Sequence, residues 1–308
     1  MKVLITGSKG FVGTAVADAL ARSGQHVVRA VRQATPGAVS VGNIDAFTSW
    51  WEALAGCDLV IHLAARVHQM HDDAVDPLTE FRRVNTDGTI RLAEQAQASG
   101  VKRFIFLSSV KVNGEESDFA YRHADLPAPK DPYGQSKFEA EQSLRRMSVD
   151  TAMDVVVVRP PLVYGPGVKA NFASLMRAVQ RGIPLPLASV TDNRRSFVAL
   201  DNLVDLLITC VDHPAAANQT FLVSDGEDLS TADLLHRLGE AMGKPARLFP
   251  VPPSILQFGA NLLGKGDMAQ RLLGNLQVDI SHTRNTLNWT PPISVDEGLR
   301  RAVAGLTP

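Results

Sequence analysis

The 308-residue chain is poor in cysteine and nearly balanced in charge. Its two cysteines, Cys57 and Cys210, lie far apart and neither belongs to a CxxC pair, which argues against a disulfide scaffold and favours a reducing compartment. A net charge of −1 leaves no broad basic surface for nucleic acid. The first residues resemble neither a signal peptide nor a membrane span, and the chain has no internal repeat or low-complexity tract. We therefore expect a cytoplasmic protein that binds no nucleic acid and does not insert into a membrane.

Apolar segments rich in β-branched residues alternate with helical segments over the first part of the chain. The strand-like segments are KVLIT, HVVRAV, DLVIHLA, RFIFLSS, DVVVVRP and TFLVS, and several are apolar at nearly every position, as in a buried parallel sheet. Between them lie amphipathic segments, two of which end at Gly24 and Gly100. The alternation predicts an α/β fold, a Rossmann-type doubly wound parallel sheet that binds ligands at the carboxyl ends of its strands.

This pattern weakens after about Gly165, where proline and glycine become more frequent. We expect residues 1–165 to form a Rossmann domain, with a returning segment at about 194–225 that contains one more strand. Residues 166–193 and 226–308 are expected to form a smaller, partly helical C-terminal lobe that binds the substrate.

A glycine-rich loop follows the first predicted strand. In ITGSKGFVGTAV the glycines Gly7, Gly10 and Gly13 come directly after a strand and open a helix. Glycines there permit a tight turn and allow backbone N–H groups to approach a pyrophosphate at the positive N-terminus of the helix. The loop therefore predicts a dinucleotide site.

The order of the motifs resembles the extended branch of the short-chain dehydrogenase/reductase superfamily. The matching motifs cover nearly the whole chain and are GxxGxxG at Gly7, HLAA at 62–65, NTDGT at 85–89 opening a helix, LSSVKVNGE at 107–115, YGQSK at 133–137, RPPLVYGPG at 159–167 and a late LNWTPP. Within that branch the pattern is similar to nucleotide-sugar epimerases, dehydratases and 4-ketoreductases. The resemblance implies a homodimer and a set of NAD(P) contacts: Gly7, Lys9, Gly10, Phe11, Val12, Arg32, Asn43, Ile44, Leu63, Ala64, Ala65, Lys137 and Pro160.

Tyr133 and Lys137 are four residues apart, so they share one face of a helix. An unperturbed phenol titrates near pH ~10, and a neighbouring ammonium together with an oxidised nicotinamide would bring it into working range. Ser109, at the end of a predicted strand, can hydrogen-bond the same substrate oxygen. Ser108 is its alternative, although the family places the active hydroxyl directly before the VxVxG segment. The family often has tyrosine where Asn113 stands.

The resemblance also implies substrate contacts in the second lobe. Asn171 opens a helix there, while Arg194 and Arg271 bind the diphosphate, with Arg195 as the rival of Arg194. A guanidinium matches phosphate oxygens in a bidentate way that lysine cannot.

His68 and His71 lie in one histidine-containing segment. We expect that segment to form a loop over the substrate, with His68 as a contact. Their spacing does not make a zinc pattern, so we expect no metal.

The second strand ends on Arg32, where an enzyme that binds NAD normally carries an acidic residue that binds the adenosine ribose. Arg32 can instead pair with a 2′-phosphate, and Lys9 adds a second charge. The family's acidic adenine contact corresponds to Asn43-Ile44 or to Asp45, which leaves the choice open. We therefore favour NADP(H), with NAD(H) as the alternative; Arg32 stacking on adenine would make the site indifferent.

The cofactor preference favours NADPH-dependent reduction of a nucleotide-activated 4-keto sugar, with UDP as the nucleotide, in surface polysaccharide biosynthesis. Dehydratases of this branch carry an Asp-Glu pair where this chain has Val110-Lys111, which argues against elimination. The close alternative is an NAD-dependent UDP-sugar 4-epimerase acting on UDP-glucose or UDP-GlcNAc. More remote alternatives are an NADP-sensing regulator and a reductase of a lipid or flavonoid ketone.

Overall fold

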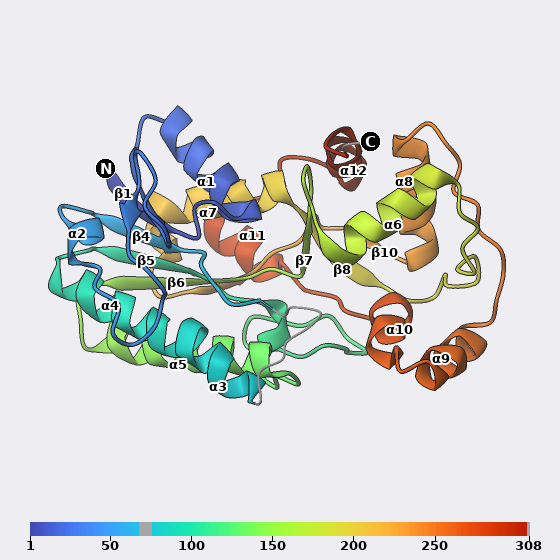
Figure 1. Cartoon of the computed structure of the whole chain (residues 1–308), viewed down its shortest axis with the longest axis horizontal. Helices are drawn as coiled ribbons and strands as arrows, with labels where there is room; N and C mark the ends of the chain where they lie inside the picture. Colours follow the sequence, from blue (N-terminus) through green and yellow to red (C-terminus); the bar gives the residue numbers. More distant parts are fainter. Residues whose placement is uncertain (68–75, 307–308) are drawn as a thin grey trace.

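In the computed structural model, which describes residues 1–67 and 76–306, seven parallel strands form one sheet (Figure 1). Their order is β3-β2-β1-β4-β5-β6-β9. The strands are β1 (Lys2–Thr6), β2 (His26–Val31), β3 (Val39–Ser40), β4 (Leu59–His62), β5 (Arg103–Leu107), β6 (Asp154–Arg159) and β9 (Thr220–Leu222). The predicted doubly wound parallel sheet is confirmed.

Side chains of the central strands alternate between two cores. Val3 and Ile5 point to one face and Leu4 to the other, and all three are fully buried. Helices cover both faces, which explains why these strands are apolar at nearly every position. On the first face lie α1 (Phe11–Arg22), α7 (Leu200–Asp212) and α11 (Ser281–Leu287); on the second lie α2 (Trp51–Leu54), α4 (Gly88–Ala98) and α5 (Pro132–Val149).

One helix begins earlier than the sequence predicts. Helix α3 (Pro77–Phe81) has Asp76 as its N-cap and continues through a π-helical turn, Arg82–Asp87, into α4. Asn85 therefore lies inside a continuous helix and does not open one. Its buried side chain bonds the backbone of Arg66, so it is not available as a cap.

A second, three-stranded sheet lies beyond the first, in the order β10-β8-β7. The sequence does not predict its strands, which are β7 (Leu162–Tyr164), β8 (Arg195–Ala199) and β10 (Asp228–Leu229), and of these β7 and β10 are only three and two residues long. Its core contains Tyr164, Phe172, Met176 and Phe197. The helices around it are α6 (Ala170–Arg181), α8 (Thr231–Ala241), α9 (Pro253–Leu262), α10 (Gly266–Leu273) and α12 (Val295–Ala304). Two short 3₁₀ turns lie elsewhere: η2 (Val110–Val112) follows β5, and η3 (Pro214–Ala216) follows α7. None of the helices in the described part of the chain has both the length and the apolar character needed to cross a bilayer.

Candidate active site

The glycine loop makes the tight turn that its spacing predicts. Gly7 has a φ of +65°, and a Cβ added to it would lie 2.8 Å from the backbone N of Ala64. A Cβ on Gly13 would lie 2.0 Å from the carbonyl oxygen of Gly7. Gly10 is the N-cap of α1 and has no side-chain cap, so the first N–H groups of the helix, at Phe11 and Val12, face the loop. This turn and open helix N-terminus fit a dinucleotide pyrophosphate.

The loop that follows β4 lies against the glycine loop. The backbone N–H groups of Leu63 and Ala64 each donate to Thr6 Oγ1 over 3.1 Å, at the end of β1. The structure thus brings Leu63, Ala64 and the adjoining Ala65 to the same carboxyl edge as the glycine loop. That edge is where open α/β sheets bind nucleotides.

The end of β2 is cationic. Ser8 Oγ donates to the carbonyl of Ala30, which ties the glycine loop to this strand, and Lys9 Nζ donates to Thr35 Oγ1 over 2.7 Å. Arg32 is exposed in the same turn. Both cations therefore lie where a group on the adenosine ribose would be bound.

The predicted adenine contacts lie farther along this edge. Ile44 packs on Gly88 at the start of α4, and the carbonyl of Asn43 accepts a hydrogen bond from Thr48.

Tyr133 occupies the first turn of α5. Pro132 opens the helix and Asp131 caps it by accepting from the N–H of Gly134 over 2.6 Å. The half-buried phenol ring meets Phe81 edge to face, with centroids 6.0 Å apart. Burial raises the pKa of Tyr133, and the negative charge of Asp131 raises it further. Within the described residues its hydroxyl has no hydrogen-bond partner, so the group is available to a substrate.

Lys137 is buried one turn farther along α5. Its Nζ donates to the carbonyl of Leu107 over 2.9 Å and lies 4.4 Å from the centre of the Phe106 ring. Burial lowers the pKa of Lys137 to about 7, and the carboxylate of Glu141 opposes that shift. Lys137 therefore gives up its proton far more readily than an exposed lysine does.

Ser109 follows β5 and caps η2, where its Oγ accepts from the N–H of Lys111 over 3.2 Å. The neighbouring Ser108 is buried, and its Oγ donates to Glu141 over 2.5 Å. Because Ser108 is committed to that internal bond, the geometry favours Ser109 as the substrate-facing hydroxyl. Pro160 lies beside this turn and its carbonyl accepts from the N–H of Val110.

Sequence reasoning missed a buried ion pair behind these residues. Arg159, at the end of β6, binds both carboxylate oxygens of Glu141 over 2.9 and 2.5 Å, and both side chains are 1% exposed. Arg159 also donates to Asn113 Oδ1 over 3.0 Å. Glu141 lies four residues after Lys137 on the same helix face, so the spacing could have identified Glu141 as a neighbour of Lys137, but not Arg159 as its partner.

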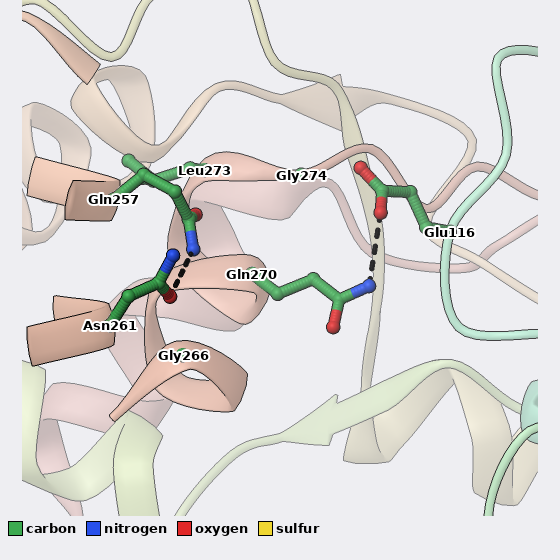
Figure 2. A pocket seen from close by; sticks show the side chains of 7 residues that line it. All are labelled: Glu116, Gln257, Asn261, Gly266, Gln270, Leu273 and Gly274. Carbon is green, nitrogen blue, oxygen red and sulfur yellow. Dashed lines mark hydrogen bonds between the residues drawn. The ribbon is translucent and has the colours of Figure 1, made fainter. Parts of the chain in front are cut away.

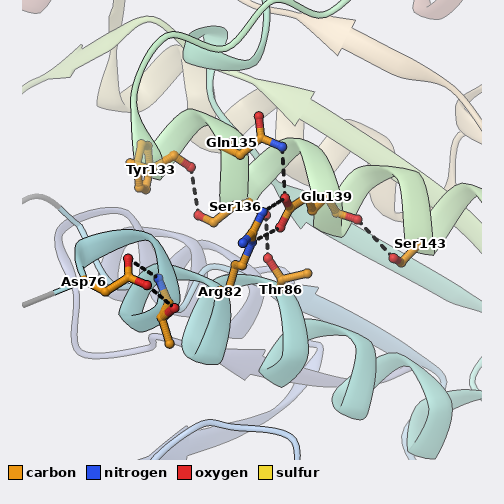
Figure 3. Close-up of polar contacts among 9 residues, drawn as sticks. Asp76, Arg82, Thr86, Tyr133, Gln135, Ser136, Glu139 and Ser143 are labelled. Atoms are coloured by element: carbon orange, nitrogen blue, oxygen red, sulfur yellow. Dashed lines mark hydrogen bonds and ion pairs between the residues drawn. The ribbon is translucent and has the colours of Figure 1, made fainter.

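Contacts with the preceding helix hold α5 in place (Figure 3). Arg82 in the π-helical turn binds both oxygens of Glu139 over 2.8 and 2.6 Å. Thr86 Oγ1 donates to the carbonyl of Ser136 over 2.9 Å, and Asn85 donates to the hydroxyl of the same serine. Polar contacts thus fix the helix that presents Tyr133.

A polar cavity of about 380 Å³ opens in the second lobe (Figure 2). The residues that line it come from α9, α10 and the segment after η2: Glu116, Gln257, Asn261, Gly266, Gln270, Leu273 and Gly274. Gln270 donates to Glu116 over 3.0 Å across the cavity. Hydrogen-bonding side chains of this kind suit a sugar or a nucleotide base.

The structure places the two candidate arginines differently. Arg194 is exposed and its guanidinium donates to the carbonyls of Thr191 and Asn193. Arg195 instead donates to the carbonyl of Gly274 over 2.9 Å, at the wall of the cavity. Burial lowers its pKa to about 10; Glu116 opposes the shift and Arg271 adds to it. Arg195 therefore lies nearer the cavity than Arg194, and Arg271 is exposed on α10; the predicted diphosphate contacts of Arg194 and Arg271, with Arg195 as the rival of Arg194, stay predictions.

Two further substrate predictions have different outcomes. Asn171 is exposed in the first turn of α6, where the sequence places it. His68 and His71 belong to residues 68–75 and lie outside the described residues.

Taken together, the glycine loop, the tyrosine and lysine on one helix face and the doubly wound sheet define a dinucleotide-dependent enzyme of the short-chain dehydrogenase/reductase type. The chain belongs to the NAD dependent epimerase/dehydratase family, whose model matches residues 3–224.

Known relatives and solved structures give the same class. The chain is 51% identical over 306 residues to a UDP-glucose 4-epimerase of Vibrio cholerae, covering 97% of this chain and 93% of that protein. It is 28% identical to an N-acetyl-α-D-glucosaminyl-diphospho-ditrans,octacis-undecaprenol 4-epimerase of Escherichia coli O157:H7, covering 82% and 77%. The structure resembles that of MoeE5 in complex with UDP-glucose and NAD, with a TM-score of 0.77, 25% identity, and coverage of 99% and 98%.

Proposed function

We propose that the protein is a UDP-sugar 4-epimerase that acts on UDP-glucose or its N-acetylated counterpart and uses a retained NAD. The observation that carries the proposal is the 51% identity to a UDP-glucose 4-epimerase along 97% of the chain. The comparisons favour this alternative over the 4-keto sugar reductase that the sequence suggested first. NAD held at the glycine loop would supply reversible hydride acceptance for C4 of the sugar.

The residues of the chain carry the proton steps of this reaction. Tyr133 takes the proton of the C4 hydroxyl. It returns the proton to the same oxygen after the 4-keto sugar has rotated to present its other face. Ser109 donates a hydrogen bond to the same oxygen and stabilises the charge that develops there. Since burial raises the pKa of Tyr133, a cationic Lys137 is required to favour the phenolate.

The second lobe holds the remainder of the substrate. Arg195 and Arg271 bind the diphosphate, and the polar cavity beside them receives a polar end of the nucleotide sugar. Asn171 and His68 complete the predicted contacts. In the homodimer that the family resemblance implies, the subunits pair through α4 and α5. The two free, buried cysteines support a cytoplasmic location.

The test is conversion without added cofactor. Purified protein is incubated with UDP-glucose, UDP-galactose is measured by anion-exchange chromatography, and denatured protein is analysed by mass spectrometry for released NAD. Tyr133→Phe should lower kcat by about 10²–10⁴-fold. Tyr121→Phe is the control and should keep most of the activity, because among the described residues the Tyr121 hydroxyl bonds the backbone carbonyl of Glu116. Failure to epimerise either UDP-glucose or UDP-GlcNAc would overturn the proposal.

A second candidate, an NADPH-dependent UDP-4-keto sugar reductase, rests on the cationic end of β2. Exposed Arg32 and Lys9 would bind a 2′-phosphate, and NADP(H) would then be consumed at each turnover. This candidate predicts protein that purifies without dinucleotide and oxidises NADPH when given a UDP-4-keto sugar. Arg32→Asp should raise the KM for NADPH by about 10-fold or more. Arg29→Gln, inside β2 and paired with Asp18, should not.

A further inference from the structure

His62, at the end of β4, is a fully buried histidine that the proton steps do not use. Its Nδ1 lies 2.7 Å from Thr6 Oγ1, at the end of β1, and its Nε2 lies 2.9 Å from Thr89 Oγ1, in α4. Both threonines are buried as well. A buried ring with a polar partner at each nitrogen is held in one orientation. The imidazole therefore joins the carboxyl edge of the sheet to the helix that follows the π-helical turn.

The hydrogen bonds of Thr6 decide the protonation of Nδ1. Thr6 Oγ1 accepts from the backbone N–H groups of Leu63 and Ala64, each over 3.1 Å. A hydroxyl has two lone pairs and one hydrogen, and these two bonds use both lone pairs. The hydrogen of Thr6 is therefore left to donate to His62 Nδ1, which must carry no proton of its own.

The hydrogen bonds of Thr89 decide the protonation of the other nitrogen. Thr89 Oγ1 donates to the carbonyl of Asn85 over 2.7 Å, which uses its hydrogen. The same oxygen must therefore accept from the N–H at Nε2 of His62. The two sides together define one species, a neutral imidazole that is protonated at Nε2.

The surroundings of His62 oppose a second proton. Burial, and to a lesser extent the positive charge of Lys137, lowers the pKa of His62 to about 3. The ring stacks on Phe106 with centroids 5.8 Å apart, and the ammonium of Lys137 lies 4.4 Å from the centre of the same phenyl ring. A proton added at Nδ1 would also face the hydroxyl hydrogen of Thr6. The neutral state therefore agrees with both the hydrogen bonds and the charges.

The segment that Thr6 binds packs on the glycine loop, where a Cβ added to Gly7 would lie 2.8 Å from the backbone N of Ala64. We propose that His62 is a positioning residue for the dinucleotide: it takes the hydroxyl hydrogen of Thr6 and so turns both lone pairs of that oxygen toward the segment. With a donor at Nδ1, Thr6 would have to accept from the ring, and one buried backbone N–H would lose its acceptor. The inference needs only a dinucleotide-dependent enzyme and does not depend on which sugar reaction the protein performs.

The first test is the ¹⁵N NMR spectrum of full-length protein labelled in histidine. The chemical shifts of the ring nitrogens distinguish a protonated nitrogen from an unprotonated one, and the signals that disappear in His62→Asn assign the residue. The expected result is a protonated Nε2 and an unprotonated Nδ1 at neutral pH, unchanged at about pH 6, where unperturbed histidines take up a proton. A protonated Nδ1 in the wild type would overturn the proposal, whether or not any variant folds.

The second test separates the two sides of the ring. An asparagine carboxamide lies near the position of Nδ1 and a glutamine carboxamide near that of Nε2, so His62→Asn keeps an acceptor for Thr6 and His62→Gln does not. Each variant is freed of dinucleotide and titrated, by fluorescence, with NADH and separately with NADPH. For the dinucleotide that the wild type binds more tightly, His62→Gln should raise the dissociation constant by about ten-fold or more, and His62→Asn by less.

A pair of threonine variants supplies the control. Thr6→Val removes the acceptor of both N–H groups and should raise the dissociation constant at least as much as His62→Gln. Thr283 is also fully buried, and its hydroxyl donates to the carbonyl of Leu222 on the edge strand β9 over 2.6 Å. Thr283→Val should therefore lower stability in urea denaturation and leave the dissociation constant unchanged. Equal dissociation constants within either pair of variants would overturn the proposal.

Discussion

The buried ion pair between Glu141 and Arg159 should dominate the response of this protein to substitution on α5. Glu141→Gln keeps the shape of the side chain but removes the charge that neutralises Arg159, which is 1% exposed. Leaving one partner of a buried pair without its counter-charge costs about 3–5 kcal/mol. The amide oxygen can still accept one hydrogen bond, so we expect a loss near the lower end, about 3 kcal/mol in the free energy of unfolding.

The same helix supplies the control. Glu139 also binds an arginine through both oxygens, but Arg82 and Glu139 have side chains that are 45% and 21% exposed. Glu139→Gln should therefore change stability far less, because water screens and replaces the interaction. The assay is urea denaturation followed by circular dichroism at neutral pH.

Glu141→Gln should also change the pH dependence of catalysis. Glu141 opposes the lowering of the Lys137 pKa, so Glu141→Gln should lower that pKa below about 7. If activity requires the Lys137 ammonium, the alkaline limb of the kcat profile should move to lower pH, while Glu139→Gln leaves the profile in place. Equal losses of stability in the two variants would refute the reasoning. So would Glu141→Leu/Arg159→Met being no more stable than Glu141→Gln, because an apolar pair should restore stability.

Three other predictions concern different parts of the site. Arg195→Ala should raise the KM for a UDP-sugar by about 10-fold or more and Arg194→Ala by much less, measured by initial rates; the reverse order would restore the original prediction from the sequence. The pKa of Lys137 falls from 10.5 to about 7 on folding, so the free energy of unfolding of the wild type should rise with pH between these values. Lys137→Met should flatten this dependence, and an unchanged slope in urea denaturation from pH 7 to 10 would contradict the prediction. Gly13→Ala should abolish dinucleotide binding or folding, since its Cβ would lie 2.0 Å from the carbonyl oxygen of Gly7, and normal NAD content by mass spectrometry would refute the geometry.

The sequence was sufficient for the features that depend on short-range pattern. Apolar runs predicted the parallel sheet, glycine spacing predicted the turn before α1, and the four-residue spacing placed Tyr133 and Lys137 on one face. Each of these follows from the period of a strand or helix or from a backbone angle that glycine adopts.

Features that depend on long-range contacts could not be predicted in the same way. Arg159 and Glu141 come from different elements, and only the fold brings them together. Arg194 and Arg195 are adjacent, and because neighbouring side chains in extended backbone point to opposite faces, a one-residue error in register exchanges their roles. The π-helical turn Arg82–Asp87 and the short strands of the second sheet leave no periodic signal of their own.

Lys111 links the two ends of the segment that joins η2, which carries Ser109 at its start, to α5, which carries Tyr133. Its ammonium binds Glu115 over 2.6 Å and also pairs with Asp131, the residue that caps α5. This excursion, residues 116–130, begins and ends near that charged junction and contacts the second lobe in between, where Tyr121 pairs with Val278 and Glu116 accepts from Gln270. Insertions or deletions within that excursion would change the cavity wall at Glu116, while the pairing of Lys111 with Asp131 keeps the end of β5 beside the start of α5. Under the proposed mechanism, substrate range can therefore evolve separately from the positions of Ser109 and Tyr133 in space.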